Sequence, residues 1–398
     1  MTSNPRKKRF TVAACAALLL TAAAAPAAVA TPQPPSAAAQ LSRDAEAIHA
    51  LGISGVQARA VGPDGRSSVA TSGTADLRTG RPVDPDGYFR MASTSKTLIA
   101  TVVLQLEAEG RLSLDDTMDR RLPDVAWGRD YDPRTITVRK LLQHTAGISD
   151  AGLPGYNSPQ EYEEQRFRRY GSEQLVERAM AQQPAEGWSY SNTGYVMLGM
   201  IIQRATGRPS HQEVQDRILR PLGLDHTHWT GSSPTLPPPH ARAYQFYGPG
   251  AETDVTVQVP VSTELSWVTT TRDENTFFRA LLSGRLLPPR LLAEMKQPAE
   301  EGPDVQQKLL GGRYGLGLVQ RPLPGCGGTY FSHEGGDGGY ITLNGVTEDG
   351  RRSVVVSMSE ARGDSEAHIN EQERAATVLV EHALCPGGTG GSAGSGAG

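Results

Sequence analysis

The sequence predicts an α+β fold in which both ends of the chain contribute strands to one antiparallel sheet. Alternating or β-branched runs lie near the start, over residues 55–61 and 67–74, and near the end, over residues 314–319, 329–333, 339–346 and 352–358. Between these regions, apolar residues recur mainly with helical spacing. We therefore expect a sheet flanked by helices, a mostly helical lobe beside it, and an active site in the seam between the two.

The first 40 residues differ in composition from the rest of the chain. A basic stretch at residues 6–9 precedes an apolar run at residues 11–25 and a small-residue cleavage site at Ala28-Val29-Ala30. This pattern predicts a signal peptide over residues 1–30 and a secreted, extracellular protein. The alternative is an uncleaved membrane anchor, which Pro26 and the weak hydrophobicity of alanine disfavour. Residues 31–40 are rich in Pro and Ala, and we expect a disordered linker there.

The overall composition is that of a globular protein, with 38% hydrophobic and 21% charged residues in 398. Removing residues 1–30 changes the formal charge from −4 to −8. An acidic chain without a basic tract is a poor nucleic-acid binder. No later apolar run approaches the length of a transmembrane helix, so we expect no membrane span after cleavage.

Cysteine usage agrees with export. Cys15 leaves with the signal peptide, and only Cys326 and Cys385 remain. In an oxidising compartment the simplest expectation is that these two form a disulfide, the alternative being two separately buried thiols. There is no Cys-x-x-Cys and no His-Glu-x-x-His motif, so we expect neither a metal nor another cofactor.

Local patterns place the helices and turns. The expected helices cover residues 41–51, 96–109, 136–148, 172–181, 195–205, 212–219, 274–282 and 372–384, with shorter helical pieces in 112–122. Turn signals lie at Pro63-Asp64-Gly65, at the proline-rich loop 234–239 and at Glu348-Asp349-Gly350. We expect a sheet-containing lobe over 41–95 and 305–385, a helical lobe over about 96–304, and a disordered Gly/Ser tail over 386–398.

Ser93 and Lys96 form the first candidate for chemistry. They are three apart where a strand is expected to run into a helix, so their side chains project from the same face. A lysine amine made neutral by desolvation can accept the serine proton, and the positive end of the helix favours the oxyanion that follows. The alternative is that Ser93 only caps the helix.

Two more short motifs follow in order. Tyr190-Ser191-Asn192 lies on a loop before a helix, where a phenol and an amide two apart can face one cleft. His333-Glu334-Gly335, followed by Gly336, lies in a candidate strand. Alone, each has a structural explanation: a half-buried loop tyrosine, a helix cap or a surface histidine.

Together, these three motifs resemble the active site of the serine penicillin-recognising enzymes. Residues 141–147 are similar to the segment that this superfamily carries between its first two motifs, and residues 314–318 to its strand leading toward the third. The two cysteines are similar to a disulfide pair of exocellular D-alanyl-D-alanine carboxypeptidases related to class C β-lactamases. The similarity covers residues 41–385 and implies a β-lactamase/transpeptidase-like fold.

The resemblance implies a role for each motif residue. Ser93 would be the acylated nucleophile, Lys96 its proton partner and Tyr190 the general acid/base, while Asn192 would bind the substrate amide. His333 would orient or polarise Tyr190. Gly335 and Gly336, the glycines of the third motif, would bind substrate. The backbone N–H of Gly336 would form an oxyanion hole together with the backbone N–H of Ser93. Whether Lys96 or Tyr190 removes the serine proton stays open.

This sequence departs from the carboxypeptidase pattern at the third motif. Glu334 and Gly336 stand where those enzymes have threonine, and Arg321 is near but not at the position of their carboxylate-binding arginine. Glu334 facing an anionic substrate would be unfavourable by about 1 kcal/mol or more. Strict strand alternation would instead turn it away from His333. Residues 262–267 also depart from the usual turn, which suggests a remodelled cleft rim.

Our first hypothesis is therefore a D-alanyl-D-alanine carboxypeptidase-like hydrolase of cell-wall peptides, with β-lactams as inhibitors or poor substrates, acting as a monomer. An esterase, D-aminopeptidase or β-lactamase on the same scaffold is the alternative, and Glu334 favours it because a carboxylate can meet a substrate amine. A catalytically silent binding module is disfavoured because all the motif residues are present. A Ser-His-Asp hydrolase is disfavoured because there is no Gly-x-Ser-x-Gly elbow.

Overall fold

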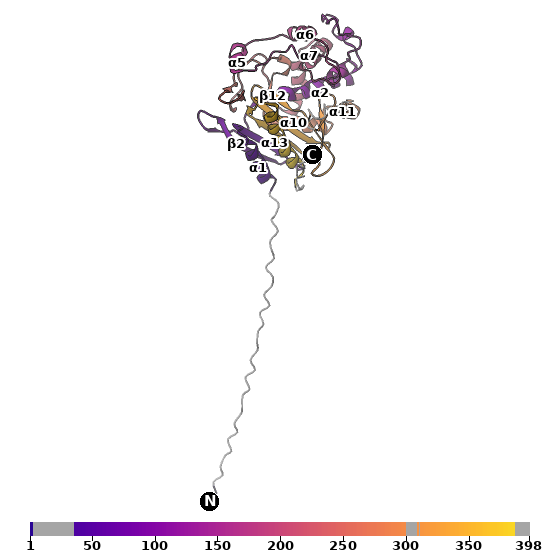
Figure 1. Ribbon diagram of the computed structural model, residues 1–398. Helices are drawn as coiled ribbons and strands as arrows, with labels where there is room; N and C mark the ends of the chain where they lie inside the picture. The colour runs from indigo at the N-terminus through magenta and orange to yellow at the C-terminus, as the bar shows by residue number, and fades with distance from the viewer. Residues whose placement is uncertain (3–35, 300–308, 310, 387–398) are drawn as a thin grey trace, which may run out of the picture. The chain divides into compact units, whose positions relative to one another are not determined.

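The computed structural model describes residues 1–2, 36–299, 309 and 311–386 (Figure 1). The expected signal peptide beyond residue 2, residues 31–35 of the expected linker and residues 387–398 of the expected tail lie outside this part. The linker prediction is wrong at its end, because helix α1 (Ala37–His49) begins within it, capped by the Ser36 side chain. Within the described residues, no helix is long and apolar enough to cross a membrane.

A nine-stranded sheet joins the two ends of the domain, as predicted. Its order is β3-β2-β1-β14-β13-β11-β10-β9, with β12 also paired to β13. At its centre, β1 (Gly55–Val61) pairs antiparallel with β2 (Ser67–Asp76) on one side and with β14 (Ser353–Met358) on the other. The remaining strands of this sheet are β3 (Arg81–Pro82), β9 (Arg313–Tyr314), β10 (Val319–Pro322), β11 (Thr329–Ser332), β12 (Gly335–Asp337) and β13 (Tyr340–Thr347).

Helices cover both faces of this sheet. The helices α1 and α13 (Glu366–Leu384) pack side by side on the central strands, with buried Leu41, Ile48 and Leu379 between them and the sheet (Figure 1). The helix α10 (Thr271–Leu282) also packs against β1, β13 and β14. The expected lobe boundary therefore misplaces α10, which covers the sheet although its residues fall within the predicted helical lobe.

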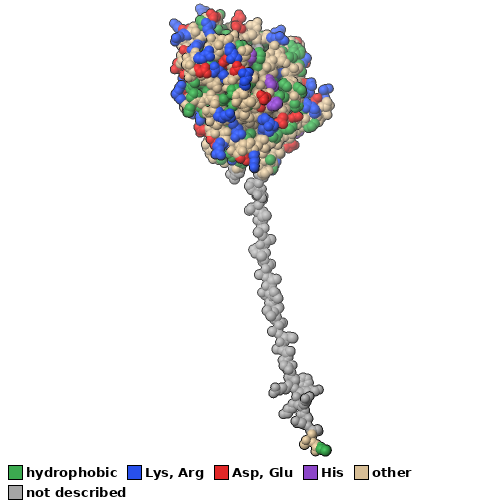
Figure 2. Space-filling model, turned by 180° about the vertical axis from the view of Figure 1, so that it is seen from behind, with side chains coloured by type: hydrophobic (Ala, Val, Ile, Leu, Met, Phe, Trp, Pro, Cys, Tyr) green, Lys and Arg blue, Asp and Glu red, His purple; other side chains and the backbone are tan. Residues whose placement is uncertain are grey.

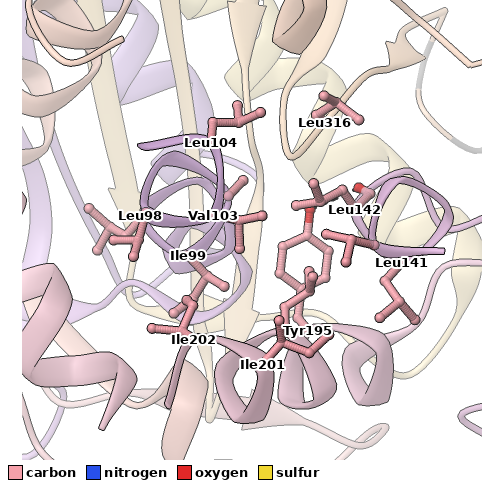
Figure 3. Close-up of a cluster of buried hydrophobic side chains, with 14 of the residues drawn as sticks. Leu98, Ile99, Val103, Leu104, Leu141, Leu142, Tyr195, Ile201, Ile202 and Leu316 are labelled. Carbon is pink, nitrogen blue, oxygen red and sulfur yellow. Dashed lines mark hydrogen bonds between the residues drawn. The ribbon is translucent and has the colours of Figure 1, made fainter. Parts of the chain in front are cut away.

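A second core lies around α2 (Lys96–Ala108) and α7 (Asn192–Thr206) (Figure 3). Leu98, Ile99 and Val103 of α2 are buried against this cluster. Tyr195 of α7 points toward the end of α4 (Val138–Leu142), and its hydroxyl donates a hydrogen bond to the Leu142 carbonyl at 2.9 Å. The helices that carry two of the motifs are thus packed rigidly together.

The other elements complete the helical region and its edges. In order they are β4 (Phe89–Arg90), the 3-10 helix η1 (Ala92–Ser95), α3 (Met118–Arg121), α4 (Val138–Leu142), α5 (Pro159–Gln165), α6 (Ser172–Met180), α8 (Ser210–Val214), the π-helical turn η2 (Gln215–Leu219), α9 (Arg220–Leu222), β5 (His228–Trp229), β6 (Tyr244–Phe246), β7 (Glu252–Asp254), the 3-10 helix η3 (Thr263–Leu265), β8 (Trp267–Thr269), α11 (Pro289–Lys296) and β15 (Glu360–Ala361).

Two predicted elements are shorter than expected, for local reasons. The helix expected over 136–148 ends at Leu142, because His144 and Gly147 adopt positive φ angles of 60° and 70°. The strand expected over 314–319 is a hairpin of β9 and β10 instead, with Gly317 at φ 78° in the turn. The alternation of apolar and polar residues in this segment does not show that the chain reverses direction at Gly317.

Cys326, just after β10, and Cys385, at the end of α13, form the expected disulfide, with 5.6 Å between their Cα atoms. The bond ties the edge hairpin of the sheet to the last helix. On the face seen in Figure 2, acidic and basic side chains are intermixed.

Candidate active site

Ser93 is held at a sharp turn between a strand and a helix, as predicted. The strand β4 pairs with β8, and η1, which contains Ser93, continues directly into α2. Ala92, immediately before Ser93, is buried and has a φ of 49°, a left-handed conformation that is uncommon for a residue with a side chain. Such conformations persist where the surrounding structure imposes them, and they cluster at functional sites.

Lys96 lies directly against the Ser93 hydroxyl. Its Nζ donates to Ser93 Oγ at 2.9 Å and to Asn192 Oδ1 at 2.7 Å, so the first two motifs meet at this amine. Lys96 has no solvent exposure. Burial lowers its pKa to about 7, although the nearby Asp150 carboxylate acts in the opposite direction. A large fraction of the amine is thus neutral at neutral pH and able to accept a proton.

Tyr190 closes the other side of this pair. Lys96 Nζ lies 4.8 Å from the centre of the Tyr190 ring. Burial raises the pKa of the Tyr190 phenol, and its hydrogen bond with Ser93 opposes the rise. The phenol therefore keeps its proton at neutral pH and can donate it.

Asp150 holds the second motif in place. Its carboxylate accepts hydrogen bonds from the Thr193 N–H at 3.1 Å, from the Thr193 hydroxyl at 2.9 Å and from the Ser191 hydroxyl at 3.2 Å. It also accepts the N–H of Asn192. A carboxylate at the start of α7 satisfies N–H groups that the helix leaves unpaired, and it fixes the position of Asn192. No local pattern in the sequence marks Asp150 as a site residue, since nothing local links it to a helix that begins at residue 192.

His144 supports the same loop and was also missed as a site residue, although it lies in the segment between the first two motifs. Its Nδ1 accepts the N–H of Ser191 at 3.0 Å, and its ring centre is 4.3 Å from that of Tyr190 and 4.6 Å from that of Tyr314. Burial holds the pKa of His144 well below its usual value, with Lys96 adding to the effect. His144 is therefore a neutral, buried side chain that packs against the Tyr190 ring.

His333 lies in the site beside Tyr190, but its ring nitrogens are bonded to other groups. Its Nε2 is bonded to the Tyr314 hydroxyl at 2.8 Å and its Nδ1 to the Glu334 carbonyl at 2.7 Å. Both ring nitrogens are thus engaged elsewhere, and the ring centres of His333 and Tyr190 are 6.5 Å apart. Burial, reinforced by Lys96, lowers the pKa of His333 well below its usual value. The role of His333 in orienting or polarising Tyr190 therefore stays a prediction.

Gly335 lets the third motif approach the Ser93 turn. A Cβ at Gly335 would lie 2.2 Å from the carbonyl oxygen of Met91, too close for any side chain. Thr94, next to Ser93, donates its hydroxyl to the His333 carbonyl at 3.1 Å and fixes the same contact. Gly336, one residue on, lines both pockets that open at Ser93.

Two pockets flank Ser93, of about 330 Å³ and about 300 Å³. The first, here called the asparagine-side pocket, is lined by Ala92, Ser93, Asp150, Leu153, Pro154, Leu175, Asn192, Thr193, Val196, Pro260, Val261, Ser262, Leu265, Gly336 and Asp337. The second, the tyrosine-side pocket, is lined by Ser93, Trp188, Tyr190, Leu309, Tyr314, His333, Glu334, Gly335, Gly336, Ile341 and Glu373. A substrate bond placed at Ser93 would extend into both.

Glu334 faces the tyrosine-side pocket together with His333. Strict alternation does not apply, because β11 ends at Ser332 and β12 begins only at Gly335. The Glu334 carboxylate forms an ion pair with Arg321, whose side chain is only 4% exposed. The arginine near the third motif is therefore paired within the protein.

A family model described as Beta-lactamase matches residues 36–379. Penicillin-binding protein 4* of Bacillus subtilis (strain 168) is 31% identical over 167 residues, which are 39% of this chain and 33% of that protein. Esterase EstB of Burkholderia gladioli is 31% identical over 176 residues, 41% of this chain and 43% of that protein. The chain thus matches less than half the length of these two relatives.

Two solved structures match over almost their whole length. A D-stereospecific amidohydrolase from Streptomyces sp. is 35% identical with a TM-score of 0.74, and the match covers 84% of this chain and 98% of that one. A D-amino acid amidase from Ochrobactrum anthropi SV3, complexed with D-phenylalanine, is 26% identical with a TM-score of 0.74, covering 88% and 99%. The fold shared with these structures is the β-lactamase/transpeptidase-like fold that the motifs implied.

Proposed function

The chain belongs to the β-lactamase family of serine hydrolases, and from this premise we propose that it is an amidohydrolase that cleaves amides of D-amino acids through an acyl-enzyme on Ser93. The observation that carries the proposal is the contact of the buried Lys96 amine with Ser93 Oγ at 2.9 Å. A serine that only capped a helix would not need a desolvated amine beside its hydroxyl.

In the proposed reaction, Ser93 Oγ attacks the substrate carbonyl carbon and Lys96 takes the hydroxyl proton. The backbone N–H groups of Ser93 and Gly336 bind the oxyanion, and Asn192 contacts the acyl part of the substrate. Tyr190 then passes a proton to the leaving nitrogen as the carbon–nitrogen bond breaks, and the proton held by Lys96 restores the phenol. Water attacks the resulting ester, which releases the acid and returns the proton to Ser93. Lys96 suits the role of base better than Tyr190, because burial lowers the pKa of the amine and raises that of the phenol.

Two features support an amide rather than a C-terminal peptide as substrate. Arg321, the cation that could receive a terminal carboxylate, is already paired with Glu334. The two structures that match over nearly their full length are named as a D-stereospecific amidohydrolase and a D-amino acid amidase. The intact contacts among Ser93, Lys96 and Asn192 also argue against a silent binding module.

A D-alanyl-D-alanine carboxypeptidase is the second candidate. The Cys326–Cys385 disulfide favours it, because the resemblance noted in the sequence places that pair in exocellular carboxypeptidases. The relative named as a penicillin-binding protein points the same way. An esterase is the corresponding proposal from the relative named EstB.

Labelling with a fluorescent penicillin tests the acyl-enzyme. We expect covalent label on the wild type and none on Ser93→Ala. Ser95→Ala is the matched control, because the Ser95 hydroxyl donates to the Ala92 carbonyl and not to the lysine; this variant should keep the label. Label that persists in Ser93→Ala would refute the nucleophile. Turnover of D-phenylalanine amide, D-alanyl-D-alanine and a short-chain ester then chooses among the activities.

We also propose that the protein is exported and that its signal peptide is cleaved after Ala30. The basic and apolar segments of residues 6–25 and the disulfide support export to an oxidising compartment. Sequencing the amino terminus of protein recovered from the culture medium tests this, and a first residue of Met1 would contradict it.

A further inference from the structure

The charges around the tyrosine-side pocket carry a second inference, about which amides the enzyme accepts. We propose that this pocket binds the leaving amine and selects amines that are uncharged or positively charged over those that carry a carboxylate. The assignment of the pocket rests on the proposed function, because it follows from the role given to Tyr190.

The leaving group is placed by the position of its proton donor. Tyr190 can protonate the leaving nitrogen only if that nitrogen lies beside it, and Tyr190 lines the tyrosine-side pocket. Asn192, which would hold the acyl part, lines the other pocket. Ser93 and Gly336 line both, as expected of groups at the bond that breaks.

The charged residues that line this pocket, among those the structure describes, are Glu334 and Glu373. Glu334 comes from the turn between β11 and β12, and Glu373 from α13. Arg321 pairs with Glu334 but does not line the pocket itself. Arg321 also interacts electrostatically with Glu373, so its single positive charge is shared between the two carboxylates of the pocket. The wall of the pocket is therefore acidic on balance.

Arg321 compensates the buried Glu373 carboxylate only in part. Burial raises the pKa of the Glu373 carboxyl, and the Arg321 charge offsets the rise without cancelling it. A positive charge on a bound amine would stabilise the Glu373 carboxylate, which lines the pocket, whereas a terminal carboxylate would add a further negative charge. One charge near the Glu373 carboxylate changes the affinity for the leaving part by on the order of tenfold.

The test uses three substrates with the same D-alanyl acyl part and different leaving amines. The leaving part of D-alanyl-D-alanine carries a carboxylate, that of D-alanyl-D-alanine amide is uncharged, and that of mono-D-alanyl-ethylenediamine carries an ammonium. For the second substrate the release of D-alanine amide is measured, because loss of ammonia would report cleavage of its terminal amide instead. For the wild type at pH 7 and low salt, we expect kcat/KM for the neutral and cationic substrates to exceed that for the anionic one by about tenfold or more. Added salt should bring this ratio closer to one, because it screens the charges.

Variants assign the selection to named carboxylates. Glu373→Gln keeps the Arg321–Glu334 pair and should reduce the ratio of cationic to anionic substrate by about tenfold. Glu334→Gln releases Arg321 and should raise kcat/KM for D-alanyl-D-alanine. The control is Glu381→Gln, which removes a charge from the same helix outside the pocket lining; this variant should leave the ratio near that of the wild type.

A wild type that cleaves D-alanyl-D-alanine as fast as its amide would overturn the inference, as would an unchanged ratio in Glu373→Gln. Either result would leave the proposed amidohydrolase standing, because the neutral substrate would still be turned over in a Ser93-dependent way. Failure of all three substrates, with no label on Ser93, would instead remove the proposed function.

Discussion

Lys96 combines a chemical role with a cost in stability. Burial lowers the pKa of Lys96 to about 7, so the lysine binds its proton less tightly in the folded state than in the unfolded state. Between pH 7 and the ordinary lysine pKa, the unfolded state binds more protons, so the free energy of unfolding rises with pH across this window. The penalty is greatest below pH 7.

The first prediction is that Lys96→Met stabilises the protein most at low pH. The variant should exceed the wild type in free energy of unfolding, and this difference should shrink by up to about 4 kcal/mol between pH 6 and pH 10. The reason is that the wild type loses the cost of burying a charged amine as the pH approaches the ordinary lysine pKa. Urea unfolding at several pH values measures it. Lys140→Met, at an exposed lysine, is the control. A gain that grows with pH would show that the buried amine is not the cause.

The second prediction concerns Asp150, which acts on Lys96 through charge. In Asp150→Asn, the rising limb of acylation rate against pH should move below its wild-type position near pH 7, because the carboxylate that favours the protonated amine is gone. The variant should also lose about 1–2 kcal/mol of stability with the helix cap. The pH profile of penicillin acylation measures the first effect. A limb that stays in place while stability falls would leave Asp150 with a structural role only.

Contacts between single residues could be predicted from the sequence where the two residues are close together in the chain. Ser93 and Lys96 are one helical turn apart, so their contact follows from spacing alone. Asp150 and His144 reach a loop some 40 residues later, and no local pattern reports such a contact. The hydrogen bond of His333 with Tyr314 is likewise not predicted from sequence, because the hairpin of β9 and β10 brings Tyr314 to it.

At the scale of elements, the close contact of η1 with β12 holds the first and third motifs together. It exists because Gly335 has no side chain where the backbone of Met91 passes. Neither strand propensity nor alternation predicts this contact, since both describe one segment at a time. The resemblance to known motifs supplied it, and the structure gives the physical reason.

The third prediction is that Gly335→Ala separates these elements. The new Cβ would clash with the Met91 carbonyl, so stability should fall by about 1–3 kcal/mol and penicillin acylation should slow by tenfold or more. Thermal unfolding and labelling rate measure the two effects. Gly155→Ala, where an added Cβ meets nothing within 4 Å, is the matched control. Normal acylation in Gly335→Ala would show that the contact is not needed for the site.

At the scale of the whole molecule, the sequence predicted a sheet built from both ends, because alternation marks each strand separately. It misplaced the boundary between the lobes, because the partners of α10 are strands far away in the chain. The disulfide is the other feature that spans the molecule, and its two cysteines were predicted to pair from their number and compartment.

The fourth prediction is that the disulfide contributes substantially to stability. It closes a loop of 59 residues, for which the entropy of the unfolded chain gives about 4 kcal/mol. The double variant Cys326→Ser/Cys385→Ser should lose up to this amount in urea unfolding. Without reductant, the intact wild-type mass should be two hydrogens below that of the dithiol. Two free thiols in the native protein would contradict the pairing.

The pairing of β1 with β14 also governs the order of events during synthesis. The ribosome makes the first hairpin early, but its neighbour in the sheet is completed only when residue 358 has been added. Ser93 is likewise made long before Gly335, the residue that lets β12 approach η1. A chain shortened before residue 335 would therefore contain Ser93 without this contact.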